Sequence, residues 1–137
     1  MAYAKGEGVP QDYAEAAKWF RLAAGQGYAD AQHNLGVMYH EGRGVPQDYA
    51  EAMKWYHLAA AQGSAEAQYN LGVMCDYGEG VPQDVIEAYA WFSVATTGGY
   101  IPADKNRDIR KEQLTAEQLA EAQKRATELF EKYGSGK

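Results

Sequence analysis

The chain has 137 residues, 46% of them hydrophobic, and a formal net charge of −6. This length and composition predict a single folded domain, and the acidic balance disfavours nucleic-acid binding because phosphates need a basic surface. No apolar run approaches the roughly 18 residues of a membrane-spanning helix, so membrane insertion is not predicted. No signal peptide is visible either, which leaves the compartment unassigned: cytoplasmic or, for a fragment, periplasmic or secreted.

A short pattern, Gly-x-Gly-Val-Pro-Gln-Asp, organises the chain. It occurs at residues 6–12, 42–48 and 78–84, so the spacing is 36 residues each time. Its glycines allow the positive φ with which a helix ends, and its aspartate can cap the next helix. A glutamate stands three residues after each aspartate, which predicts a variant of the capping box. One connector repeated at this spacing predicts a helical repeat array.

The repeat frame divides one domain, residues 1–137, into five parts. Residues 1–8 match the end of a partial repeat. Residues 9–44 and 45–80 are full repeats that agree at 25 of 36 positions, and residues 81–113 form a divergent last repeat. Residues 114–133 form a C-terminal capping helix.

Each repeat is expected to hold two helices. In the first repeat they cover residues 13–25 and begin again at Ala29, with apolar residues recurring at helical spacing. Gly36 and Gly72 lie inside the second helices, where glycine costs about 1 kcal/mol relative to alanine. Their recurrence indicates a close contact with a neighbouring helix.

The last repeat keeps its first helix, residues 84–97, but its second helix departs from the pattern. Arg107 and Asp108 stand where Leu35 and Gly36 should recur, and a polar outer face suits the end of a repeat array. We interpret the basic cluster on this helix as a solvated face. It comprises Lys105, Arg107, Arg110 and Lys111.

Thr115 and Gln118 predict a capping box that opens the last helix. An apolar stripe follows, made of Leu119, Ala122, Ala126, Leu129 and Tyr133. Charge pairs Glu121–Arg125 and Glu128–Lys132 are expected on the solvent side.

The repeated set Asp-Tyr-Ala-Glu-Ala…Lys-Trp-(Phe/Tyr)…Leu-Ala-Ala…Gly…Ala…Leu-Gly…Gly-x-Gly-Val resembles the Sel1-like repeat, a relative of the tetratricopeptide repeat. In the second full repeat it is carried by Asp48, Ala52, Trp55, Tyr56, Ala59, Ala60, Gly63, Ala67, Leu71, Gly72, Gly78, Gly80 and Val81. The resemblance covers residues 1–100. It implies an all-α solenoid, a right-handed superhelix of antiparallel helix pairs, which acts as a scaffold for protein or peptide partners, often in bacteria.

Catalytic and metal chemistry find little support. Some cysteine-rich members of this family are linked to β-lactam hydrolysis, but no serine here has the Ser-x-x-Lys spacing, so a β-lactam-directed hydrolase is a remote alternative. His33, His40 and His57 have no completing ligand and are interpreted as surface histidines. Cys75, the only cysteine, is interpreted as a buried thiol. No enzyme activity, cofactor or metal is therefore predicted.

A partner-binding surface is better supported, because positions that differ between repeats are free to face a partner. On the first helices these are Ala17/Met53/Tyr89, Arg21/His57/Ser93 and Gly25/Ala61/Thr97. The resemblance places the first helices on the concave face. The predicted partner-binding residues are Tyr13, Lys18, Arg21, Tyr49, Lys54 and His57.

Two functions remain open beside the hydrolase. The first is a non-catalytic scaffold whose mildly acidic concave face binds an extended or basic peptide or protein. The alternative is a structural unit of a larger protein that self-associates through its uncovered N-terminal end.

Overall fold

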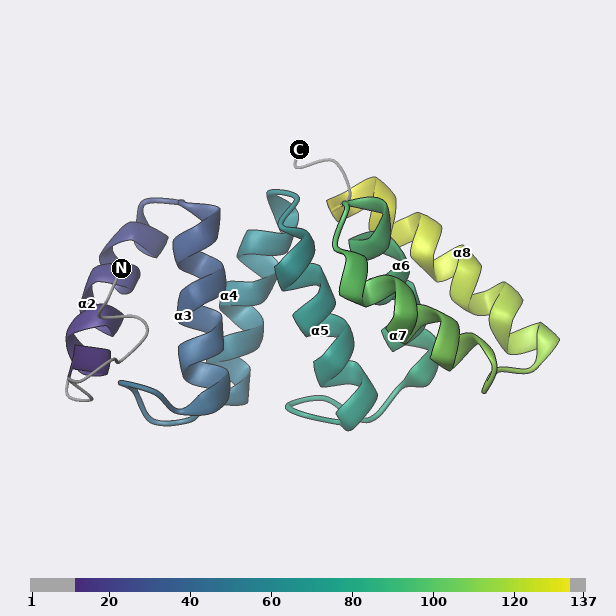
Figure 1. Ribbon diagram of the computed structural model, residues 1–137, viewed down its shortest axis with the longest axis horizontal. Helices are drawn as coiled ribbons and strands as arrows, with labels where there is room; N and C mark the ends of the chain where they lie inside the picture. The colour runs from purple at the N-terminus through teal and green to yellow at the C-terminus, as the bar shows by residue number, and fades with distance from the viewer. Residues whose placement is uncertain (1–11, 134–137) are drawn as a thin grey trace. The chain divides into compact units, whose positions relative to one another are not determined.

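The computed structural model describes residues 12–133, and every regular element in that range is an α-helix. The helices form consecutive pairs, so the predicted all-α helical-repeat fold is confirmed (Figure 1). None of these described helices is both long enough and apolar enough to cross a membrane. The predicted partial repeat at residues 1–8 lies outside the described range.

The chain divides into two compact units, Met1–Ala59 and Ala60–Lys137. The helices of the first unit are α2 (Asp12–Gly25), α3 (Ala29–Glu41) and most of α4 (Tyr49–Ala61). Those of the second are α5 (Ala65–Tyr77), α6 (Val85–Thr97), α7 (Ile101–Lys111) and α8 (Ala116–Tyr133).

The repeated connector ends one helix and starts the next, as its residues predict. Gly42 and Gly78 adopt left-handed φ values of 71° and 70°, and their amides bond back to the helices that they close. Asp48 accepts a hydrogen bond from the Glu51 amide, and Asp84 accepts one from the Glu87 amide. The reciprocal half of the capping box was predicted wrongly. The Asp48 amide donates to the Tyr39 carbonyl at 2.9 Å instead, which leaves the glutamates for other contacts.

The glycines inside the second helices receive aromatic rings. A Cβ added at Gly36 would lie 2.6 Å from Cε1 of Tyr56, and one added at Gly72 would lie 2.6 Å from Cε1 of Phe92. Any side chain at either glycine would overlap the ring of the following helix. The predicted close contact is confirmed, and the group that makes it is a side chain.

In the first unit, Ala24, Ala31 and Leu35 form a buried cluster where α2 and α3 meet. Trp55 of α4 packs against this cluster. The tryptophan of one repeat therefore covers the helix pair of the repeat before it.

In the second unit, α8 packs along α6 (Figure 1). The rings of Trp91 and Tyr133 lie 5.0 Å apart, and the Gln68 amide donates to the Tyr133 carbonyl at 3.1 Å. Arg125 binds both carboxylate oxygens of Glu87, at 2.9 and 3.0 Å, and also contacts Glu128. The predicted partner of Arg125 was Glu121, but its main contact is with Glu87. This contact holds α8 on α6.

The interpretation of the basic residues of α7 as a solvated face is wrong for Arg110. Its guanidinium donates from Nε to a carboxylate oxygen of Asp76 at 3.0 Å, and the Asp76 side chain is only 6% exposed. Lys105 and Lys111 are exposed as predicted.

Cys75 is a free, buried thiol, as predicted. Burial, with the charges of Glu87, Asp84 and Asp76, raises the pKa of this thiol from 9.0 to about 12. The Cys75 thiol therefore keeps its proton in the folded state at pH values at which it loses that proton in the unfolded chain.

We expect this difference to lower the free energy of unfolding as the pH rises from about 9 to about 12, by up to roughly 1.4 kcal/mol per unit. A Cys75→Ala variant should lack this component of the slope. Urea titrations of both proteins at several pH values measure it. Equal slopes for the two proteins would contradict the assignment.

Candidate functional site

On α2, the predicted partner-binding residues fall into two groups. Tyr13 packs against a buried cluster that includes Met38, and the guanidinium of Arg43 lies 5.6 Å from the centre of its ring. Lys18 and Arg21 are exposed, and Arg21 donates to the Tyr39 hydroxyl at 2.9 Å. Tyr13 is thus mainly a packing residue, whereas Lys18 and Arg21 offer positive charge to solvent.

The equivalent residues of α4 show the same division. The ring of Tyr49 packs edge-on against His40 at 5.5 Å. Lys54 is exposed, 3.6 Å from a Glu51 oxygen, with its ammonium 4.8 Å from the centre of the Trp55 ring. His57 is half-buried one turn further along the helix.

The histidines are not simple surface groups, which corrects their predicted role. The Nδ1 atom of His40 lies 3.3 Å from the hydroxyl of Tyr56, and its ring packs between those of Tyr49 and Tyr56. His33 packs 6.0 Å from the centre of the Tyr56 ring. No group of three or more potential metal ligands occurs between residues 12 and 133.

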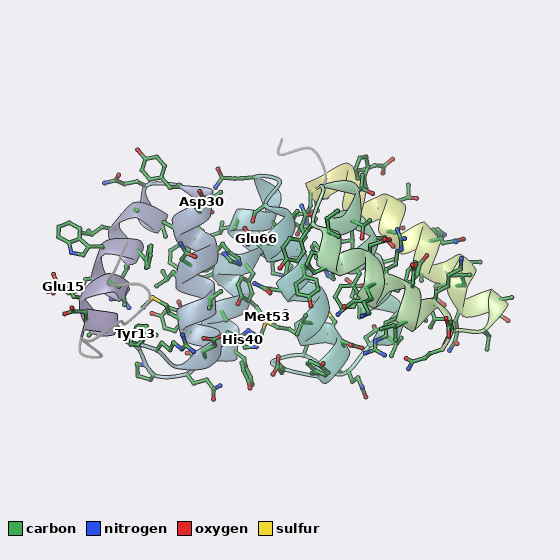
Figure 2. All side chains as sticks on the ribbon, viewed as in Figure 1. Tyr13, Glu15, Asp30, His40, Met53 and Glu66 are labelled. Atoms are coloured by element: carbon green, nitrogen blue, oxygen red, sulfur yellow. The ribbon has the colours of Figure 1, made fainter. Side chains whose placement is uncertain are left out.

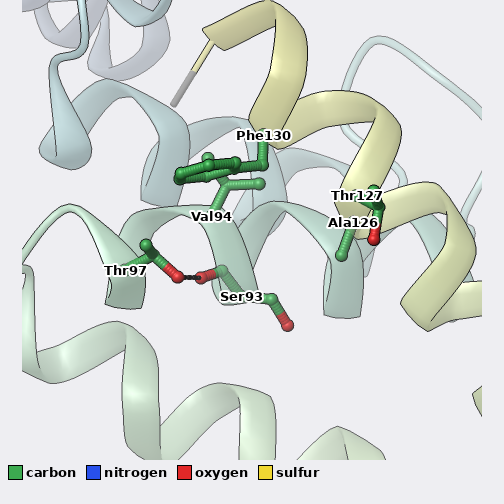
Figure 3. A pocket seen from close by; sticks show the side chains of 6 residues that line it. All are labelled: Ser93, Val94, Thr97, Ala126, Thr127 and Phe130. Atoms are coloured by element: carbon green, nitrogen blue, oxygen red, sulfur yellow. Dashed lines mark hydrogen bonds between the residues drawn. The ribbon is translucent and has the colours of Figure 1, made fainter. Parts of the chain in front are cut away.

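Of the positions that vary between repeats, Ala17 and Tyr89 are buried, so they cannot contact a partner. In the second unit the variable residues Ser93 and Thr97 line a hollow of about 280 Å³ between α6 and α8. Figure 3 shows Phe130 over one side of it, with Val94 beneath. Two positions that vary between repeats therefore border this hollow.

The hollow is apolar in character although three of its residues carry hydroxyls. Thr97 donates to the Ser93 carbonyl at 3.0 Å, and Thr127 donates to the Gln123 carbonyl at 3.2 Å. Both hydroxyls are therefore bound to their own helix backbone. The Phe130 side chain, 42% exposed, adds an aromatic surface.

Sequence reasoning missed the contribution of α8 to this hollow. Two signals were present: Ala126 belongs to the predicted apolar stripe of the last helix, and Phe130 is an apolar residue next to Leu129 of that stripe. Ser93, the serine nearest to the remote hydrolase hypothesis, has no general base among the lining residues.

Comparison with known proteins accounts for the repeated pattern. The Sel1 repeat model matches residues 1–28, 29–64 and 65–100. The chain belongs to the Sel1 repeat family. The second and third matched units begin at α3 and α5, the second helices of their pairs, whereas the connector-based frame begins at the first helix. Both frames have a period of 36 residues.

Two solved Sel1 repeat structures are similar to this chain. One is c5321, described as a protective antigen with an SLR fold from uropathogenic Escherichia coli, at a TM-score of 0.91 and 38% identity. The alignment covers 97% of this chain and 29% of that protein. The other is a Sel1 repeat protein from Oxalobacter formigenes, at a TM-score of 0.69 and 36% identity, covering 78% of this chain and 44% of that one. No curated protein matches the chain.

Membership defines the general class of function. Sel1 repeat proteins are generally scaffolds that bind protein partners, and they are typically non-catalytic.

Proposed function

We propose that this chain is a non-catalytic scaffold that binds a protein or peptide segment along its first helices, on the face expected to be concave. The observation that carries the proposal is the exposure of Lys18, Arg21 and Lys54 at recurring positions of α2 and α4. These side chains are exposed even though Arg21 and Lys54 also contact neighbouring residues, and exposed cations are well placed to bind carboxylates. Local charge thus favours an acidic segment, although residues 1–100 are acidic on average.

In the second unit, the hollow between α6 and α8 supports the same proposal. It lies at the positions of α6 that correspond to Arg21 and Gly25 of α2. Its apolar lining suits one aliphatic or aromatic side chain of a bound segment. Tyr13 and Tyr49 support the surface from beneath, because both rings are engaged within the first unit.

The test is a peptide-display selection against the intact chain, followed by affinity measurements on the best binder. We expect Lys18→Glu and His57→Glu each to weaken binding about tenfold, because each places a carboxylate on the proposed face. Lys105→Glu, an exposed change on α7, is the matched control and should leave the affinity unchanged. Equal affinities for all four proteins would remove the first-helix face as the binding surface.

A further inference from the structure

The way in which α8 lies on α6 shows how a helix can occupy a first helix. Arg125 of α8 binds both carboxylate oxygens of Glu87, and Phe130 lies over Val94, which is only 2% exposed (Figure 3). Glu87 lies in the first turn of α6 and Val94 lies two turns later. The contacts therefore advance in the same direction along both helices.

The middle one of the first helices, α4, has the same kinds of residue at the equivalent positions. The contacted positions of α6 are Glu87, Trp91 and Val94, and they recur as Glu51, Trp55 and Leu58 on α4 and as Glu15, Trp19 and Leu22 on α2 (Figure 2 labels Glu15). On α4 the apolar position is open, because Leu58 is 44% exposed. Since first helices precede and follow α4 in the chain, this exposure does not arise at an end of the array.

The stacking of one repeat on the next does not cover this apolar position. In the first unit, Trp55 of α4 packs on the buried cluster of α2 and α3, yet Leu22 of α2 remains 61% exposed. The contact of α8 with Val94 is thus one that α4 does not make with α2. It shows that the exposed face of a first helix can accept a helix in addition to the stacked repeats.

The charges of α4 complement those of a helix placed in this way. On α8, Arg125 pairs with Glu128, three residues further along, at 3.2 Å. On α4, Glu51 pairs with Lys54, also three residues further along, at 3.6 Å. When two such helices run in the same direction, the basic residue meets Glu51 and the acidic residue meets Lys54.

We propose that the partner of this scaffold is an amphipathic α-helix that lies along α4 in the direction in which α8 lies along α6. It carries a basic residue for Glu51, an acidic residue for Lys54 and an aromatic residue for Leu58. The inference rests on the proposed function, because it uses the same face of the first helices, and it specifies the partner as a helix. Contact residues of such a helix recur at spacings of three and four.

A second copy of the chain is a poor occupant of this face. Its own α8 has the matching charges, but the contact side of that helix is already used, because Ala122, Leu129 and Tyr133 are buried. The ring of Tyr133 also lies 5.0 Å from that of Trp91. The occupant is therefore a different polypeptide.

The probe is a synthetic peptide of residues 114–133, capped at both ends and labelled with a fluorophore. Titration with the intact chain, followed by fluorescence anisotropy, should show saturable binding with a dissociation constant below about 1 mM. Leu58→Glu in the protein should weaken binding at least about tenfold, because it places a carboxylate beneath the aromatic residue. Ile109→Glu on α7 is the matched control, since Ile109 is 45% exposed, and it should leave the affinity unchanged.

Two further changes test the helical conformation and its direction. A Gln123→Pro peptide should bind at least about tenfold more weakly than a Gln123→Ala peptide, because proline breaks the helix at a residue whose side chain is exposed in α8. An Arg125→Glu peptide should bind the parent protein several-fold more weakly and should regain affinity for a Glu51→Arg protein.

The proposal is overturned if the parent peptide shows no saturable binding up to about 1 mM, if Leu58→Glu leaves its affinity unchanged, or if Glu51→Arg does not rescue the Arg125→Glu peptide. Equal binding of the proline and alanine peptides would assign the face to an extended segment. A dimer of the free chain in analytical ultracentrifugation that Leu58→Glu converts to a monomer would assign it to a second copy. Segments selected by display that respond to Lys18→Glu would still support the scaffold, so the two failures are distinguishable.

Discussion

A Gly72→Ala substitution is expected to lower the free energy of unfolding by about 2 kcal/mol. The new methyl group would lie 2.6 Å from Cε1 of Phe92 and 3.2 Å from Cβ of Trp91, and both aromatic residues are buried. Overpacking of this kind costs about 1–3 kcal/mol, and we take the upper end because neither ring can move into solvent. The higher helix propensity of alanine offsets about 1 kcal/mol of this cost, so the expected net loss is about 2 kcal/mol.

Urea unfolding followed by circular dichroism measures this effect. Gly25→Ala is the matched control: Gly25 ends α2, and nothing lies within 4 Å of its added Cβ. The same chemical change there should be neutral or stabilising by up to about 1 kcal/mol. A stabilised Gly72→Ala protein would show that the glycine is not required by packing.

The fold was largely predictable from the sequence because its signals are local and repeated. Gly42 and Asp48 set the connector, and an apolar spacing of three and four residues set the helices around it. The predicted first helix at residues 13–25 differs by one residue from α2, and the capping box of Thr115 and Gln118 forms with bonds of 3.0 and 3.1 Å. Each of these features depends on residues close together in the chain.

The errors concern contacts between residues distant in sequence. His40 was predicted to be a surface histidine, and Asp76 occupies the same repeat position. In the first unit His40 lies within hydrogen-bonding distance of the Tyr56 hydroxyl. The equivalent ring in the second unit is Phe92, which has no hydroxyl, and Asp76 binds Arg110 of the divergent α7 instead. The changes from His40 to Asp76, from Tyr56 to Phe92 and from Met74 to Arg110 are therefore linked through contacts between helices. An alignment of the repeats treats these three positions as independent.

The candidate site was predictable in part for the same reason. Lys18 and Lys54 of the predicted partner-binding set are exposed, whereas Tyr13 and Tyr49 mainly support the packing of the first unit. That these residues bind a partner stays a prediction.

An Arg110→Met substitution is expected to lower the free energy of unfolding by about 3 kcal/mol. It would remove the guanidinium from the Asp76 carboxylate, whose side chain is only 6% exposed, while that of Arg110 is 21% exposed. An unpaired charge at a buried position costs about 3–5 kcal/mol, and partial access of water to Arg110 favours the lower end. Thermal and urea unfolding both measure the loss.

The double variant Asp76→Leu with Arg110→Met separates the charge from the packing. Because it removes both charges, it should be markedly more stable than Arg110→Met alone and close to the parent protein. Lys111→Met is the control on the same helix, and its exposed side chain should contribute less than about 0.5 kcal/mol. If Arg110→Met were as mild as Lys111→Met, the ion pair would not be what fixes α7 on the second unit. If the double variant were as unstable as Arg110→Met, the cost would come from lost packing and the predicted role of charge would be wrong.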